Sequence, residues 1–133
     1  MATFNWNNKT QISLEELKKQ KEQELSEKCQ QEILNGFDYT FNGITYHFSF
    51  DFEAQLNFQG AERILKAGLI PSLKWTVRNG DIYERIDIDE NMMDGLAIAI
   101  LQHKNLNISR FRDELYPLIV VATSKTELDS IVW

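Results

Sequence analysis

The sequence has little of what several classes of protein require. Its 133 residues include one cysteine, Cys29, so no disulfide can form within the chain. A chain without disulfides suits a reducing cytoplasm. The longest apolar run, Leu118–Ala122, is far shorter than the roughly 20 residues of a membrane-spanning helix. Residues 1–12 are polar and lack the apolar segment of a signal peptide. We therefore expect no contact with membranes.

The chain also lacks an excess of basic residues. It has 14 Lys and Arg against 20 Asp and Glu, a formal net charge of −6. Proteins that bind nucleic acid present a basic face, so we expect no nucleic-acid partner. The hydrophobic fraction of 43% and the aromatic fraction of 11% are enough for a packed core. We predict a flexible arm over residues 1–12 and a single domain over residues 13–133.

Two alternating stretches predict β-hairpins. In residues 37–50, Asn42-Gly43 separates two such runs, and both central positions of this turn need a positive φ. A two-residue turn places six apolar side chains on one face, with Phe41 opposite Ile44, Tyr39 opposite Tyr46 and Phe37 opposite Phe48. The rest of the chain should cover this face.

A second hairpin is predicted around Asn79-Gly80, but its register stays open. In the simplest register Lys74 faces Arg85 and Trp75 faces Glu84, and both pairs are unfavourable. A one-residue bulge would instead place Arg85 beside Trp75. The sequence does not decide between these two registers.

Helices are predicted on both sides of each hairpin. Ser13 and Glu16 form a capping box at the start of a long helix over residues 13–35. Asp51 and Asp89 can cap helices over residues 52–67 and 90–103. Gly60 should break the first of these helices or mark a close approach of another backbone.

The remaining residues predict a C-terminal helical group. A helix should start at Asn107 or Ser109, with a kink or a split near Tyr116 because Pro117 lies inside its pattern. A last helix should start at Ser124. The fold class is therefore α+β: two antiparallel β-hairpins packed with an N-terminal long helix, a middle helix and a C-terminal helical group. The two hairpins could share one sheet or remain separate.

No catalytic or metal-binding constellation stands out, so we predict neither an enzyme nor a metal or cofactor site. His47 is expected to face Asp38 across the first hairpin, and His103 to lie on the surface at a helix end. Cys29 lacks a basic environment and is expected at a buried or half-exposed helix position. Asp87-x-Asp89-x-Asn91 begins like a calcium loop but lacks the required glycine and terminal glutamate. These acids fit a strand end and a helix cap.

Several residues between Tyr46 and Trp133 form a pattern. They are Tyr46, then Asp51 with Gln55, Asn57 and Gly60, then Trp75, Phe111, Ala122-Thr123, Leu128, Ile131 and Trp133. Over about residues 30–133 the chain resembles the small domain of unknown function in tail-fibre and tail-tip proteins of bacteriophages and in XkdW-like proteins of defective prophages. The resemblance implies a structural or attachment role without catalysis, in the virion tail or, before assembly, in the host bacterial cytoplasm.

The long helix is where we expect a partner to bind, because Lys21 and Glu24 interrupt its apolar stripe. The expected contact residues are Phe4, Trp6, Leu14, Leu17, Lys21 and Leu25. The partners would be other phage tail or baseplate proteins, or a second copy of the chain, and no small-molecule ligand is expected. Two alternatives are a host-directed phage inhibitor or adaptor, and a receptor-binding module whose exposed aromatic residues stack on cell-wall glycan.

Overall fold

The computed structural model describes residues 12–133, so the expected contact residues Phe4 and Trp6 lie outside the described part of the chain. The described residues form two compact units. Unit 1 consists of residues 12–29 and 108–133, and unit 2 consists of residues 30–107. The fold class is α+β, as predicted.

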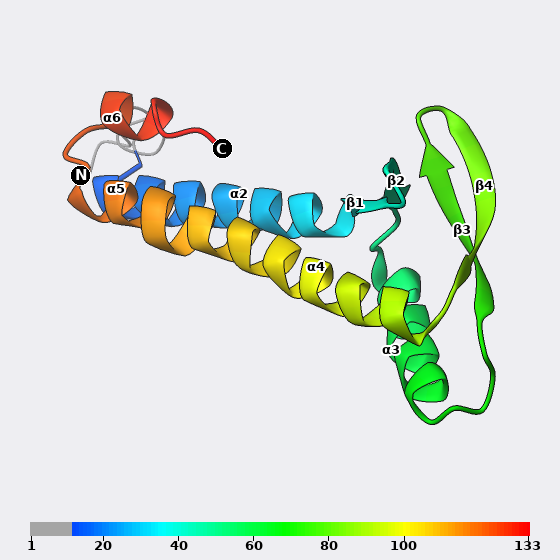
Figure 1. Ribbon diagram of the computed structural model, residues 1–133. Coiled ribbons are helices and arrows are strands. Elements are labelled where there is room, and N and C mark those ends of the chain that lie inside the picture. The colour runs from blue at the N-terminus through cyan, green and yellow to red at the C-terminus, as the bar shows by residue number, and fades with distance from the viewer. Residues whose placement is uncertain (1–11) are drawn as a thin grey trace, which may run out of the picture. The chain divides into compact units, whose positions relative to one another are not determined.

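In chain order, the elements are α2 (Leu14–Leu34), β1 (Phe37–Phe41), β2 (Ile44–Phe48), α3 (Phe52–Lys66), β3 (Leu73–Asn79), β4 (Ile82–Ile88), α4 (Glu90–Ser109), the π-helical segment η1 (Arg110–Leu115), α5 (Tyr116–Val121) and α6 (Lys125–Asp129) (Figure 1). Four helices start at their predicted caps, and Ser124 Oγ accepts the N–H of Glu127 at 3.1 Å at the start of α6. The N–H of Glu16 donates to Ser13 Oγ at 3.2 Å, and Asp51 and Asp89 accept backbone N–H groups at 2.8 and 2.9 Å.

The two hairpins of unit 2 join in one antiparallel sheet of four strands, in the order β1-β2-β3-β4. The first hairpin has the predicted register, with Tyr39 opposite Tyr46. Its turn residues Asn42 and Gly43 both have a positive φ. A tight Asn-Gly turn leaves only one register, which is why the sequence predicted it correctly.

The second hairpin has neither of the registers considered from the sequence. Asn79 pairs with Ile82, so the turn consists of Gly80 and Asp81 instead of Asn79 and Gly80. Gly80 has a φ of +62°, whereas Asp81 is not left-handed. This is the pattern of a two-residue turn that needs glycine only at its first central position.

The observed register removes both of the unfavourable pairs. Lys74 lies opposite Asp87, and Lys74 Nζ is 3.1 Å from Asp87 Oδ1. Trp75 lies opposite Ile86. The side chains of Trp75 and Ile86 lie on the opposite face of the sheet from Lys74, whose face is exposed to solvent.

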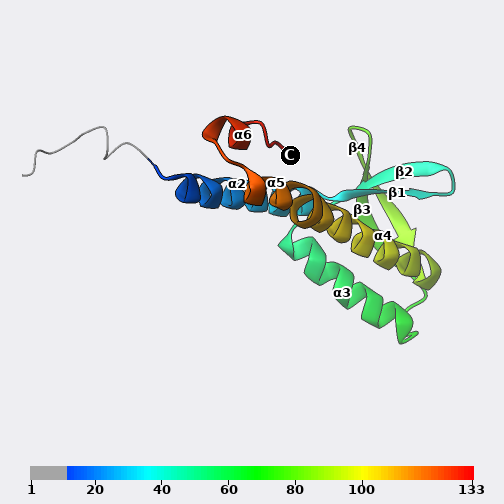
Figure 2. The ribbon, with the colours of Figure 1, turned by 90° about the vertical axis from the view of Figure 1, so that its left-hand side faces the viewer.

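Helices α3 and α4 cover one face of the sheet (Figures 1 and 2). Phe58 of α3 packs against Phe48 at a ring-centroid distance of 6.3 Å and stacks on Trp75 at 4.6 Å. The hydroxyl of Tyr39 lies so close to Gly95 of α4 that a Cβ there would overlap it. Phe37, Tyr46 and Phe48 of the predicted apolar face are therefore buried, whereas Ile44 beside the turn is 43% exposed.

Two predictions about helix boundaries were wrong. Helix α3 runs without a break through Gly60, where an added Cβ would meet no atom within 4 Å. Helix α4 does not end at His103 but continues through Ser109 into η1. Asn107 Nδ2 donates to the His103 carbonyl at 2.9 Å. Asn107 therefore lies inside α4 and does not start a new helix.

The irregularity expected near Pro117 takes the form of a π-turn. The N–H of Tyr116 donates to the carbonyl of Phe111, five residues earlier. In a regular helix the proline ring would collide with the carbonyl of Asp113, four residues before it. The wider turn accommodates the ring, so the chain stays helical instead of breaking.

In unit 1, the first part of α2 is tied to the C-terminal segments. Lys18 Nζ donates to the Val120 carbonyl at 2.8 Å, and Lys21 Nζ donates to the Ile131 carbonyl at 3.4 Å. The buried apolar side chains of this unit are Leu25, Cys29, Phe111, Leu115, Ile119, Ala122, Leu128 and Ile131. Unit 1 therefore has a core of its own, built from both of its segments.

Candidate functional site

The expected contact residues of α2 are largely engaged within unit 1. Leu25 is 2% exposed and belongs to the core, and the side chain of Lys21 is only 13% exposed. Leu14 and Leu17 are half-buried. The interrupted stripe arises because Lys21 reaches a backbone carbonyl of the C-terminal segment. A sequence pattern alone cannot reveal a bond that spans 110 residues.

Both histidines bind backbone carbonyls at or just after the C-terminal end of α2. His47 Nε2 donates to the Asn35 carbonyl at 2.9 Å, and its Nδ1 lies 2.8 Å from Asp38 Oδ1, which confirms the predicted cross-strand pair. His103 Nε2 donates to the Ile33 carbonyl at 2.9 Å. The prediction that His103 lies on the surface was wrong, since its ring is half-buried against Phe37. Both side chains thus have a structural task at a helix C-terminus.

Cys29 is 4% exposed, so the expectation of a buried position is confirmed. Burial raises the pKa of the Cys29 thiol, and the positive charge of Arg112 opposes this with a smaller effect. A buried thiol with a raised pKa is a poor nucleophile.

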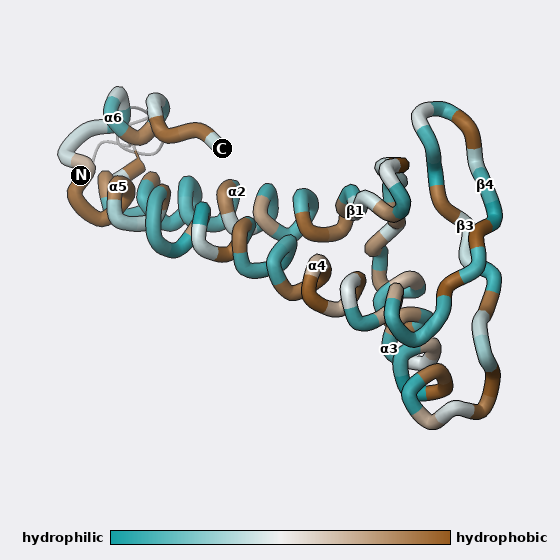
Figure 3. The backbone as a smooth tube through the Cα atoms, viewed as in Figure 1, coloured by the Kyte–Doolittle hydropathy of each residue, from teal (hydrophilic) through white to brown (hydrophobic). Residues whose placement is uncertain are grey.

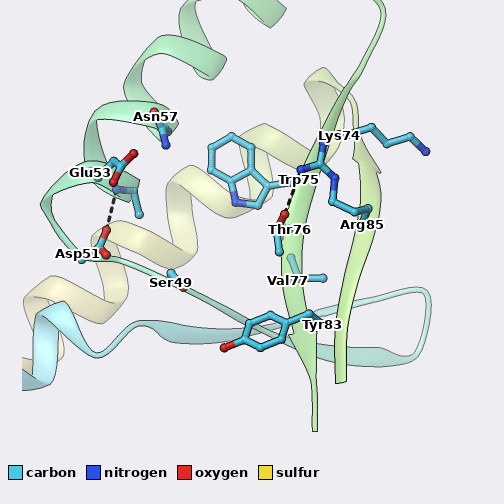
Figure 4. Close-up of a pocket in the computed structure, with 11 residues that line it drawn as sticks. Ser49, Asp51, Glu53, Asn57, Lys74, Trp75, Thr76, Val77, Tyr83 and Arg85 are labelled. Atoms are coloured by element: carbon cyan, nitrogen blue, oxygen red, sulfur yellow. Dashed lines mark hydrogen bonds between the residues drawn. The ribbon is translucent and has the colours of Figure 1, made fainter. Parts of the chain in front are cut away.

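Unit 2 has a cleft of about 340 Å³ between β3 and the first turn of α3 (Figure 4). Its α3 side carries Asp51, Glu53 and Asn57, and Trp75 points toward it from β3. The remaining lining residues are Ser49, Ala54, Lys74, Thr76, Val77, Tyr83 and Arg85. The volume lies in the range of ligand-binding clefts.

The polar side chains of the cleft differ in what they already bind. Asp51 caps α3, and Arg85 Nη1 donates to Thr76 Oγ1 at 3.1 Å. Lys74 is paired with Asp87. Glu53 is exposed, and within residues 12–133 its carboxylate has neither a hydrogen bond nor an ion pair. Among the described residues, the Glu53 carboxylate of the cleft is thus free to bind a partner.

Unit 1 has a second recess, an apolar groove of about 290 Å³. It is lined by Leu115, Leu118, Val121, Ala122, Glu127, Ser130, Ile131 and Val132. The segment after α6 is brown in Figure 3, which marks it as hydrophobic. Val121 is 70% exposed and Val132 is 67% exposed, so the groove opens to solvent through apolar side chains.

Some residues of the pattern that carries the phage-tail resemblance are buried, and others are exposed. Ala122, Leu128 and Ile131 are in the core of unit 1. Gln55 Nε2 donates to the Phe50 carbonyl at 3.1 Å and so fixes the entry into α3. Asn57 is exposed and faces the cleft. Among the aromatic side chains, Tyr46 is 7% exposed, whereas Tyr83 is 72% exposed.

No group of three or more His, Cys, Asp or Glu side chains in residues 12–133 is placed to hold a metal ion. None of the helices described here is long and apolar enough to cross a membrane.

The fold defines a small α+β protein that consists of a sheet with two covering helices and a helical unit. A family model described as a domain of unknown function (DUF4376) matches residues 16–132, and the chain belongs to this family. No curated protein and no solved structure matches the chain.

Proposed function

We propose that this protein is a non-enzymatic structural or attachment protein of a bacteriophage or prophage tail that acts through contacts with other tail or baseplate proteins. The resemblance over residues 30–133 supports the tail, and the surface of unit 1 supports action by contact. The protein would then be found in the virion tail or, before assembly, in the host bacterial cytoplasm.

The apolar groove of unit 1 is the observation that carries this proposal. Leu118, Val121 and Val132 are 49%, 70% and 67% exposed and line the same recess. Single exposed apolar residues are common, but a contiguous group beside a groove is typical of a protein contact.

The polar groups of the groove are already satisfied. Ser130 Oγ donates to the Glu127 carbonyl at 2.6 Å, and the Glu127 carboxylate accepts from the N–H and hydroxyl of Thr123 at 2.7 and 3.0 Å. A partner therefore gains most by presenting apolar side chains. The proposed contact thus lies on the C-terminal segments that bind α2, next to the helix where the sequence placed it.

The proposal can be tested by placing charge in the groove. Val121→Asp combined with Val132→Asp should abolish co-purification with phage or prophage particles on a density gradient, because a partner would have to bury two carboxylates. Both side chains point to solvent, so the thermal midpoint of the free protein should stay within about 2 °C of the wild type.

Leu106→Asp is the matched control, since Leu106 is 72% exposed but does not line the groove. This variant should co-purify like the wild type. The proposal fails if the double variant co-purifies unchanged, or if peptide mass spectra of purified particles contain none of this protein. Recovery with one stoichiometric host protein instead would support the host-directed alternative.

A further inference from the structure

Strand β3 is longer than β2, the strand on one side of it. It pairs with β4 over its whole length, from Leu73 opposite Ile88 to Asn79 opposite Ile82. With β2 it pairs only at Arg78, opposite His47. Among residues 12–133, residues 73–77 of β3 therefore have no neighbouring strand on the β2 side. Such an edge presents unpaired backbone donors and acceptors.

The cleft of unit 2 lies at this open edge. Four consecutive residues of β3 line it, namely Lys74, Trp75, Thr76 and Val77. Successive side chains of a strand point to opposite faces of the sheet, so a recess on one face meets only alternate residues. A recess that meets all four lies beside the edge of the strand. The facing wall is the segment that leaves β2 and starts α3, as Figure 4 shows.

The charges of the cleft indicate what the open edge would accept. Lys74 and Arg85 already bind Asp87 and Thr76, and Asp51 holds the start of α3. Among the described residues 12–133, Glu53 is the carboxylate of the cleft that has no partner, and it faces β3 across the cleft. The ring of Trp75 is held on one side by Phe58, so its position is fixed before anything binds.

We propose that this cleft accepts an extended segment of another polypeptide, which adds to β3 as a further strand. An apolar side chain of that segment would rest on Trp75, and a lysine or arginine beside it would pair with Glu53. Main-chain hydrogen bonds supply affinity in this mode of recognition, and side-chain contacts supply selectivity. The proposal concerns unit 2 and does not depend on a location in the phage tail.

A blocked heptapeptide of alternating valine and lysine is a suitable probe. Added to the full chain labelled with ¹⁵N, it should slow amide hydrogen exchange at alternate residues within 73–77. Two N-methylated versions of the peptide, methylated at odd or at even positions, block opposite edges of the added strand. One should lose at least about tenfold in affinity, and the other should bind like the parent.

Glu53→Gln should weaken binding about two- to fivefold, the range of an exposed ion pair, and a valine–glutamate heptapeptide should bind more weakly than the lysine peptide. Glu62→Gln is the matched control on the same helix, because Glu62 does not line the cleft. The proposal is overturned if both methylated peptides bind like the parent, or if protection appears in β4 instead of β3. It is also overturned if a chitin oligosaccharide shifts the Trp75 indole resonance and the peptides do not.

Discussion

At the scale of single residues, Gly36 decides how the long helix passes into the sheet. Its φ is +93°, and a Cβ there would overlap the carbonyl of Phe48 and crowd Nε2 of His47. We expect Gly36→Ala to lower the free energy of unfolding by at least about 1–3 kcal/mol, because the backbone is left-handed and the neighbouring atoms are backbone or already bonded. Urea unfolding followed by circular dichroism measures this change.

Gly60→Ala is the control for this prediction. Gly60 lies inside α3, and a Cβ there would meet nothing within 4 Å. Alanine is the better helix former, so this change should raise the stability by about 0.5–1 kcal/mol. Equal effects of the two substitutions would show that the close approach at Gly36 does not constrain the fold.

At the same scale, sequence reasoning succeeded where the determining contact is local. The pairs Asp38–His47 and Ser13–Glu16 follow from a short turn and a helix start. The bond from His103 to the Ile33 carbonyl joins residues 70 positions apart and has no local signal. The same is true of Lys21, whose partner lies in the C-terminal segment.

At the scale of elements, the second hairpin offers a direct test of its register. Thr76 lies opposite Arg85, and directly opposed residues in an antiparallel pair have Cα atoms about 4.5–5.5 Å apart. Thr76→Cys with Arg85→Cys should therefore form a disulfide under mild oxidation, as a mass loss of two hydrogens. Cys29 is replaced by serine in both proteins compared, so that the new pair is alone.

Thr76→Cys with Tyr83→Cys is the comparison, because this pair would be opposed if Asn79-Gly80 formed the turn. In the observed register these two residues are diagonal and about 7–8 Å apart, too far for a disulfide. Oxidation of this second pair at the faster rate would contradict the register.

The start of α6 should make stability depend on pH. Hydrogen bonds from the backbone and the hydroxyl of Thr123 hold the pKa of the Glu127 carboxyl below its ordinary value of 4.5. A carboxyl whose pKa is lower in the folded chain stabilises that chain above pH 4.5 and loses this contribution as the pH falls through the folded value.

Glu127→Gln should therefore reduce the free energy of unfolding at pH 7, and the difference from the wild type should shrink toward pH 3. Glu114→Gln, an exposed change in the same unit, should show no such trend. A difference that stays constant with pH would mean that the charge of Glu127 does not contribute.

The elements also show why the fold could be predicted further than the site. Turn and cap residues placed the helix starts at Asp51 and Asp89 and the first hairpin. The turn at Gly80-Asp81 could have been recognised too, since only it sets Lys74 opposite Asp87. The cleft could not be predicted, because it forms where β2 ends and β3 continues. How the two hairpins pair with each other cannot be inferred from the sequence of either hairpin.

At the scale of the whole molecule, charge limits the choice of partners. The formal net charge is −6, and the acidic residues exceed the basic ones by 20 to 14. We expect no retardation of double-stranded DNA or of an RNA hairpin at 10 μM protein and physiological ionic strength, of about 0.15 M. A gel-shift or fluorescence-anisotropy assay at this salt concentration tests the expectation. Binding that weakens steeply with added salt would contradict it.

The composition of unit 1 has a consequence for biosynthesis. This unit joins residues 12–29 to residues 108–133, with the whole of unit 2 between them. A ribosome delivers the chain from its N-terminus, so Leu25 and Cys29 emerge long before the side chains that will cover them. Unit 2 can fold while translation continues, whereas the apolar side of early α2 stays exposed to water until residues 108–133 have been synthesised. A chaperone that binds exposed apolar side chains would therefore have a binding site within residues 12–29 during this interval.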